Sequence, residues 1–247
     1  MEIIKHQQHD ITNILKKLRD YLLHDAVGNK IAKIVLFGSH AKGYATPNSD
    51  MDIMIFTADG KDTEKRLLDK IYDFMIEHNT PLEIVVSDVS DLYLSKDYFT
   101  YNIIHYGVEV YSMEKSELKK HMIRDLHNLA EEYLESAEDV LEKGRMRLAI
   151  DAGYNSAELS AKALILLKED DLPGSHGGIV SLFGQLFIKT EEINKDVGRT
   201  LNMALELRNK ARYKPNVSFS KDDTDLVLNL ARTFLKIVSN KIEDKTG

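Results

Sequence analysis

The chain contains no cysteine, no apolar run long enough to span a membrane, and no excess of positive charge. Without cysteine, disulfides and thiolate zinc sites are excluded, and a reducing compartment is the natural location. The first residues show neither a long apolar core nor a cleavage-like segment. We therefore expect a cytoplasmic protein with no membrane partner.

The acidic charge balance limits the partners that composition favours. A net charge of −7 argues against a general electrostatic attraction to nucleic acid, although it leaves room for a local basic groove. The length of 247 residues allows two modest domains, each with its own hydrophobic core. Length and charge thus indicate a two-domain globular protein without a strongly basic surface.

One stretch combines a glycine turn with two carboxylates. An apolar run over residues 34–37 ends at Gly38 and Ser39, and a second, alternating run begins at Asp50 and Asp52. Gly38 permits a sharp turn, and Ser39 offers a hydroxyl and an N–H where anions are favoured. Side chains two apart in a strand share a face, so the two carboxylates converge. They suit Mg²⁺, which completes its shell with water and phosphate oxygens, so the stretch predicts nucleotide chemistry.

This stretch resembles the signature of the DNA polymerase β-type nucleotidyltransferase superfamily. The residues that match are Gly38, Ser39, Ala41, Lys42, Gly43, Ser49, Asp50 and Asp52. Lys42 stands where the family usually has arginine, which keeps the charge but loses the bidentate fork. The family's third carboxylate lies on a neighbouring strand, and Glu83 occupies that position, although aspartate is commoner there. Either half alone suits an ordinary turn or surface carboxylates, whereas both halves in order favour the site.

The resemblance implies transfer of a nucleoside monophosphate from an NTP to an acceptor hydroxyl, with release of pyrophosphate. The residues expected to be catalytic and to bind two Mg²⁺ ions are Asp50, Asp52 and Glu83. The residues expected to bind the nucleotide are Gly38, Ser39, Lys42 and Ser49. The acceptor stays open between a protein tyrosine and a small molecule such as an aminoglycoside.

Hydrophobic periodicity predicts an α/β first half with a small mixed sheet, followed by an all-α bundle. In the first half, helices are expected over 10–22, 62–78 and 96–106, and strands over 31–37, 51–56, 82–86 and 108–111. In the second half, helices are expected over 117–143, 147–168, 179–189, 195–213 and 221–241. We place a nucleotidyltransferase domain at 1–113 and the bundle at 114–247.

The second half resembles the HEPN domain, a helical bundle that often accompanies minimal nucleotidyltransferases. The segments that carry this likeness are 152–164, 175–177, 181–184 and 207–213. HEPN ribonucleases have an arginine followed after a few residues by a histidine. Here Arg208 and Asn209 begin that motif, but Tyr213 stands at the later position. A phenol with an unperturbed pKa of about 10 is a poor general base near neutral pH, so we expect a motif remnant without ribonuclease activity.

Two other polar residues and two other functions are left open. Glu158 is interpreted as a salt bridge inside the bundle, or alternatively as a base or substrate contact. His176 is interpreted as a solvated or loop-ordering histidine of a glycine-rich loop, or alternatively as a base. One alternative function is a HEPN ribonuclease or RNA-binding toxin–antitoxin module that the first half regulates. The other is a non-catalytic nucleotide-binding protein. RNA is possible but not favoured, because the motif histidine is missing and the charge is acidic.

The last helix predicts self-association. Its apolar positions suggest more hydrophobic surface than one small bundle buries, with an internal core as the alternative interpretation. The positions concerned are Leu226, Leu228, Leu230 and Leu235. We therefore expect a homodimer that forms through the helical half.

Overall fold

The computed structural model describes residues 2–46, 49–58, 61–94 and 97–243. The chain divides into two compact units, Met1–His121 and Met122–Gly247, and the division falls within helix α6 (Lys115–Glu142). The sequence-based boundary at residue 113 lies in the link before that helix and stays a prediction. Within the described ranges, no helix has both the length and the apolar character that crossing a membrane requires.

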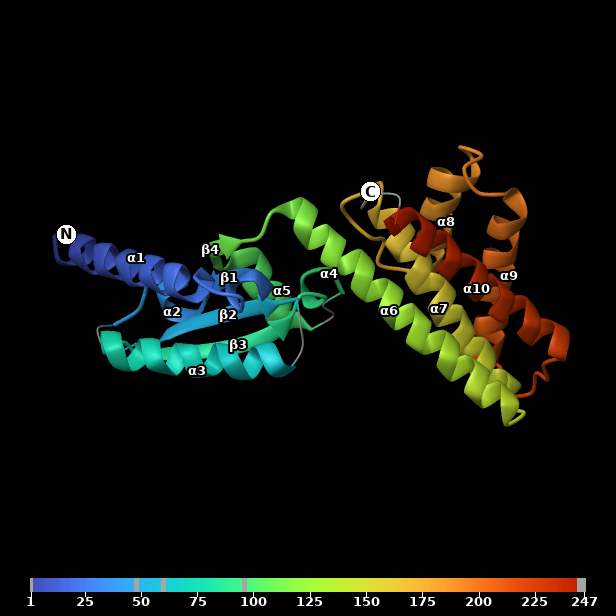
Figure 1. Ribbon diagram of the computed structural model, residues 1–247, viewed down its shortest axis with the longest axis horizontal. Coiled ribbons are helices and arrows are strands. Elements are labelled where there is room, and N and C mark those ends of the chain that lie inside the picture. Colours follow the sequence, from blue (N-terminus) through green and yellow to red (C-terminus); the bar gives the residue numbers. More distant parts are fainter. Residues whose placement is uncertain (1, 47–48, 59–60, 95–96, 244–247) are drawn as a thin grey trace. The chain divides into compact units, whose positions relative to one another are not determined.

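The first unit is built on a mixed four-stranded sheet in the order β3-β2-β1-β4 (Figure 1). β1 runs antiparallel to both β2 and β4, whereas β2 and β3 are parallel. The strand bounds are Ile31–Leu36 for β1, Met51–Thr57 for β2, Leu82–Asp88 for β3 and Val108–Ser112 for β4. The carboxylate-bearing strand β2 is therefore internal, and it begins at the same edge of the sheet as β3.

Both faces of the sheet are covered, which explains why its inner strands are almost wholly apolar. On one face, Ile53 and Ile55 of β2 pack into a core with Leu18 of α1 and Phe74 of α3. On the other face, residues of β2 share a core with Ile103 of α5. The helix bounds in this unit are Glu2–Leu23 for α1, Gly38–Lys42 for α2, Lys61–His78 for α3, Asp91–Leu94 for α4 and Tyr98–Tyr106 for α5.

The second unit is a helical bundle around α7, which packs against α8, α9 and α10 (Figure 1). Most of α7 from Ala149 onward is buried. The helix bounds are Met146–Leu166 for α7, His176–Phe183 for α8, Lys195–Tyr213 for α9 and Lys221–Glu243 for α10, with a π-helical turn, η2, at Gly184–Ile188. The expected fold class, an α/β half with a small mixed sheet followed by an all-α half, is confirmed.

Several element predictions need correction. The first helix begins at Glu2 rather than at residue 10. The helix expected over 96–106 is shorter, α5 beginning at Tyr98 after a separate turn, α4; residues 95–96 lie outside the described ranges. The helix expected from residue 179 begins at His176 because the Ser175 hydroxyl accepts a hydrogen bond from the Gly178 N–H at 3.1 Å and caps it.

The apolar positions that predicted self-association lie mainly inside the bundle. Leu228 and Leu230 are 1% and 3% exposed, and Leu235 is buried as well. These side chains therefore fill the internal core, which was the alternative interpretation. The homodimer stays a prediction, but the leucines of α10 no longer support it.

Candidate functional site

The predicted turn and the predicted acidic strand meet at a single close contact. β1 ends at Leu36, and the Phe37 N–H donates a hydrogen bond to the Asp52 carbonyl oxygen at 2.9 Å. Gly38 then adopts a φ of +68°, and a Cβ atom placed on it would lie 1.8 Å from Asp52 Oδ2. Glycine has no Cβ atom and adopts this φ without strain. The backbone of the turn can therefore lie directly against the Asp52 carboxylate. The sequence-predicted Gly38 and Asp52 thus lie side by side.

The neighbouring strand brings a second carboxylate beside Asp52. Asp52 and Glu83 are direct partners in the parallel register of β2 and β3. Side chains of register partners point to the same face, and neighbouring strands lie about 4.8 Å apart. Asp52 is half-buried and Glu83 is exposed. Asp50 is exposed just before β2 begins, two residues from Asp52, and its place on the same side stays a prediction.

The loop before Asp50 is closed by its own hydrogen bonds. The Ser49 hydroxyl lies 2.9 Å from the Thr46 N–H and 3.0 Å from the Thr46 hydroxyl. The Ser49 N–H in turn donates to the Thr46 carbonyl oxygen at 3.0 Å. The structure therefore uses Ser49, which the sequence assigned to the nucleotide, to close this loop. Lys42 is exposed at the end of α2, and Ser39 is half-buried in its first turn.

The chemistry of these donors fits a divalent cation. Asp52 and Glu83 present carboxylate oxygens, which are the ligands that Mg²⁺ prefers. Within the described ranges, no three His, Cys, Asp or Glu side chains are grouped closely enough to hold a metal by themselves. Mg²⁺ is usually bound by one or two carboxylates together with water and substrate phosphates. The residues present therefore suit a metal that arrives with a nucleotide.

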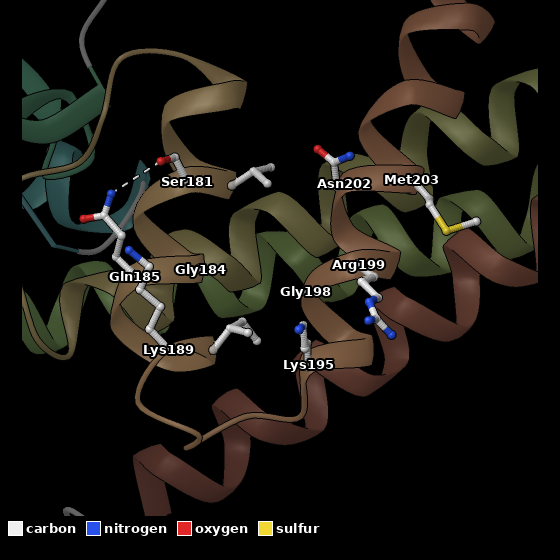
Figure 2. Close-up of a pocket in the computed structure, with 11 residues that line it drawn as sticks. Ser181, Gly184, Gln185, Lys189, Lys195, Gly198, Arg199, Asn202 and Met203 are labelled. Carbon is white, nitrogen blue, oxygen red and sulfur yellow. Dashed lines mark hydrogen bonds between the residues drawn. The ribbon is translucent and has the colours of Figure 1, made fainter.

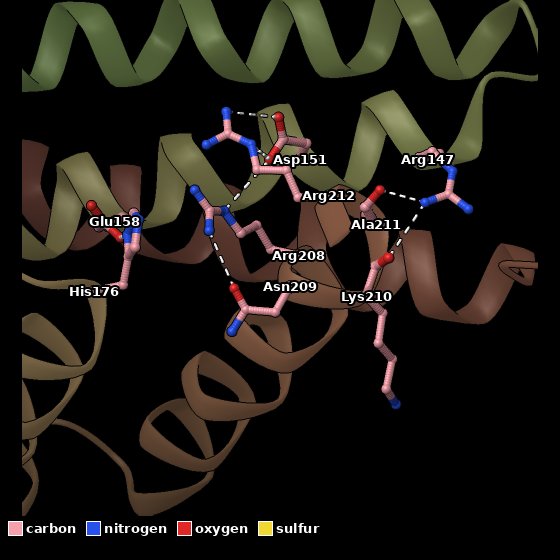
Figure 3. A network of polar contacts seen from close by, with 9 residues as sticks. All are labelled: Arg147, Asp151, Glu158, His176, Arg208, Asn209, Lys210, Ala211 and Arg212. Atoms are coloured by element: carbon pink, nitrogen blue, oxygen red, sulfur yellow. Dashed lines mark hydrogen bonds and ion pairs between the residues drawn. The ribbon is translucent and has the colours of Figure 1, made fainter. Parts of the chain in front are cut away.

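The helical unit holds the predicted motif arginine in a buried ion pair (Figure 3). Arg208 is 2% exposed, and its Nε lies 3.5 Å from Asp151 Oδ1. Arg212 Nε lies 3.3 Å from the same oxygen, and Arg208 Nη1 donates to Asn209 Oδ1 at 3.2 Å. The guanidinium carbon of Arg208 is 5.9 Å from the centre of the exposed Tyr213 ring. The three motif residues are therefore together, and the arginine faces Asp151 inside the protein at ion-pair distance, without a hydrogen bond from its Nε to any of the described residues.

A second buried acid lies further along α7. Glu158 is 6% exposed and accepts from Lys162 Nζ at 2.9 Å. It is also paired with His176 Nδ1 (Figure 3). Burial raises the pKa of Glu158, but the hydrogen bond from His176 and the Lys162 charge outweigh it, so this pKa lies below 4.5. Burial and then the Glu158 charge raise the pKa of the Tyr154 hydroxyl, which stays neutral.

These contacts correct one interpretation and support another. His176 is the first residue of α8, not part of a glycine loop, and it orders that helix start against Glu158. The salt-bridge interpretation of Glu158 is confirmed. Sequence reasoning missed Asp151, although Asp151 and Glu158 are two helical turns apart on α7 and so share a face. The spacing of seven residues could have predicted that both acids face the same side of α7.

The helical unit also has a surface groove between α8, η2 and α9 (Figure 2). Its volume is about 680 Å³, and its lining includes the cationic side chains Lys189, Lys195 and Arg199. Arg199 is paired with Asp196 at 3.0 Å. Gly198 packs against Ile188, where an added Cβ would come within 2.8 Å of that side chain. A modest basic groove thus exists on a chain whose overall charge is acidic.

Comparison with known proteins accounts for both halves of the chain. A family model described as polymerase beta, nucleotidyltransferase matches residues 11–116, and one described as HEPN domain matches residues 123–242. A candidate toxin of Methanocaldococcus jannaschii is 31% identical over 121 residues, which are 49% of this chain and 78% of that protein. The chain joins a polymerase β-type nucleotidyltransferase domain to a HEPN domain. Both resemblances drawn from the sequence are confirmed.

Two further similarities concern proteins named as adenylyl-transferring enzymes. A candidate protein adenylyltransferase of Methanocaldococcus jannaschii is 28% identical over 110 residues, 44% of this chain and 97% of that protein. The solved structure of spectinomycin adenyltransferase AAD(9) from Enterococcus faecialis, with ATP and spectinomycin, aligns with 94% of this chain and 99% of its own at 13% identity. Its TM-score of 0.30 is too low for this likeness to inform the site.

The contact in the nucleotidyltransferase domain predicts a specific difference between two glycines. Gly43 also has a positive φ, +78°, but a Cβ placed on it would meet nothing within 4 Å. We expect Gly38→Ala and Gly43→Ala each to lose roughly 1 kcal/mol of unfolding free energy through backbone strain. Gly38→Ala should lose more, because Asp52 must move, and adding Asp52→Ala should remove most of this excess, since only the Asp52 Cβ, at 3.1 Å, then remains. Urea unfolding checks this; equal losses for the two glycines would contradict the contact.

The HEPN domain generates a prediction on pH. Because the native pKa of Glu158 lies below its usual 4.5, its stabilisation is fully present above pH 4.5 and is lost as pH falls through the native pKa. Glu158→Gln should therefore lower the unfolding free energy at pH 7 by about 1–3 kcal/mol, with a smaller difference at pH 3. Exposed Glu135→Gln is the control. A loss independent of pH would refute the ion-pair account.

Proposed function

We propose that this protein transfers a nucleoside monophosphate from an NTP to an acceptor hydroxyl. The observation that carries the proposal is the Asp52 carboxylate, which the Gly38 turn contacts on one side and Glu83 flanks on the next strand. A phosphate-sized turn beside converging carboxylates is what phosphoryl transfer needs, since that chemistry depends on positioning and charge stabilisation.

Each side chain has a proposed role in the reaction. The Gly38 and Ser39 amides and the Ser39 hydroxyl hold the outer phosphates, and Lys42 adds positive charge. Asp50 and Asp52 hold the metal that accompanies the nucleotide, with Glu83 as the third carboxylate. When bound, Mg²⁺ neutralises charge that develops around the α-phosphorus and orients the triphosphate.

In the transfer step one bond to the α-phosphorus forms and another breaks. The acceptor oxygen attacks the α-phosphorus, and the bond from that phosphorus to the oxygen bridging to the β-phosphate breaks. Pyrophosphate leaves with the electron pair of that bond. The hydroxyl proton passes to Glu83, which is exposed and so open to an incoming acceptor.

The acceptor proposed first is a protein hydroxyl, and the donor ATP. The relative named as a candidate protein adenylyltransferase supports this choice, and its match covers 97% of that protein. A small hydroxylated molecule is the other acceptor class. Incubation with each radiolabelled NTP and Mg²⁺, with and without cell lysate, separates the classes by whether the label ends on protein, small molecule or RNA.

Neutralising either aspartate should stop transfer. We expect Asp50→Asn and Asp52→Asn each to lower the rate of pyrophosphate release by at least about 100-fold, because an amide keeps the shape but loses the charge that holds the cation. Asp73→Asn, an exposed aspartate on α3, is the matched control and should keep the parent rate. Parent-like release by both site variants would refute the proposed site. Nucleotide binding without turnover in the parent would favour the non-catalytic alternative.

The ribonuclease alternative gives the opposite pattern. Arg208 is buried against Asp151 and so is poorly placed to stabilise charge on an RNA phosphate, and Tyr213 is a weak base at pH 7. Purified protein should leave single-stranded RNA and tRNA intact on denaturing gels, with or without Mg²⁺. Cleavage that disappears in Arg208→Ala but persists in Asp50→Asn would move the active chemistry to the HEPN domain.

A further inference from the structure

His40 links the turn helix α2 to the residue that precedes Asp50. Its Nε2 atom lies 3.0 Å from the Ser49 carbonyl oxygen, nine residues along the chain. The side chain is half-buried, and the neighbouring Ala41 packs against the core of the sheet. The histidine therefore projects from a helix that is itself anchored.

The contact requires a proton on one ring nitrogen of His40. A carbonyl oxygen can only accept, so Nε2 must be the donor. Nδ1 is buried and, among the residues that the structure describes, has no hydrogen-bond partner. The ring thus makes one directional hydrogen bond, and that bond goes to the backbone of the acidic segment.

Helix α2 is tied to both ends of the aspartate pair. At its first residue, the Gly38 backbone packs against the Asp52 carboxylate. Two residues later, His40 holds Ser49, whose own hydroxyl and N–H are already bonded to Thr46. Ser49 is therefore hydrogen-bonded through its N–H, its hydroxyl and its carbonyl oxygen, and the bond to the carbonyl oxygen comes from His40 on the turn helix. Asp50, which is exposed and lies outside β2, is the next residue after Ser49.

We propose that His40 is a positioning residue that sets the place of Asp50 through the Ser49 carbonyl. This inference rests on the proposed function, because it assigns Asp50 to the metal that accompanies the nucleotide. Asp52 is held by the sheet and by Gly38 and does not need this support. Loss of the His40 bond should therefore weaken metal binding and turnover while leaving contacts of the turn with the phosphates in place.

The test compares three substitutions at residue 40. His40→Leu removes the donor, His40→Asn keeps polarity but is too short to reach the carbonyl, and His40→Gln can place an amide N–H near the position of Nε2. The matched control is His105→Leu, because His105 also bonds a carbonyl, that of Tyr101 at 2.9 Å, on helix α5.

The main readout needs no turnover. Electron paramagnetic resonance measures Mn²⁺ affinity in the presence of an ATP analogue with a methylene group between the α- and β-phosphates. We expect His40→Leu and His40→Asn to weaken Mn²⁺ binding about tenfold or more, as loss of a ligand-orienting contact does. His40→Gln should restore most of it. Steady-state kinetics should show the loss in kcat, with KM for the NTP within about twofold of the parent.

The outcomes separate this inference from the proposed function. Parent-like Mn²⁺ affinity in His40→Leu overturns the role of His40 and leaves the proposed function standing. If His40→Leu does not fold, the same result in His40→Asn decides the question. A loss that His40→Gln fails to restore also overturns the role, since it indicates packing rather than the hydrogen bond. Failure of the parent to bind Mn²⁺ with the analogue overturns both.

Discussion

The carboxylate of Asp52 occupies the space that a side chain at Gly38 would need. Together with the hydrogen bond from the Phe37 N–H to the Asp52 carbonyl oxygen, this close approach joins the end of β1, the turn and the start of β2. The antiparallel pairing of β1 and β2, with Leu36 opposite Ile53, places the two segments next to each other. The glycine then allows a closeness that any other residue would prevent.

The pairing of strands in the sheet places the carboxylate of Glu83 beside Asp52. Parallel pairing aligns the starts of β2 and β3, so an acid at the second position of each strand arrives as a register pair. Burial of both faces fixes that register, since a slip of one residue would exchange the faces. Ile53 would then point to the other core, and Asp52 would point to the core that Ile53 now occupies. The apolar packing of the domain and the placement of its acids therefore depend on the same strand alignment.

The sequence predicted features that depend on local pattern. The turn at Gly38, the strand at Asp52 and the pairing position of Glu83 follow from strand alternation and from the family signature. It did not predict the contact of His40 with Ser49 or of Glu158 with His176, because patterns along one sequence do not reveal which distant segments meet. Periodicity also shows that a leucine is apolar without showing what covers it, so the leucines of α10 suggested an interface but fill the bundle core.

The HEPN domain illustrates why a motif needs its surroundings. Arg208 matches the position of a catalytic arginine, yet the structure buries it against Asp151. Two carboxylates of α7 hold the charges around it: Arg208 and Arg212 share Asp151, and Lys162 and His176 share Glu158. An arginine held inside the bundle in this way is not exposed to an RNA phosphate, so its position in the motif does not by itself indicate catalysis.

The account is tested most directly by locating the cation. A crystal grown with Mn²⁺ and the methylene-bridged ATP analogue gives an anomalous signal at each bound metal. We predict a peak in contact with Asp50 and Asp52, beside Glu83, with the outer phosphates against the Gly38 turn. Nucleotide and metal bound only in the HEPN domain, or a nucleotide at the turn whose metal touches none of these carboxylates, would contradict it.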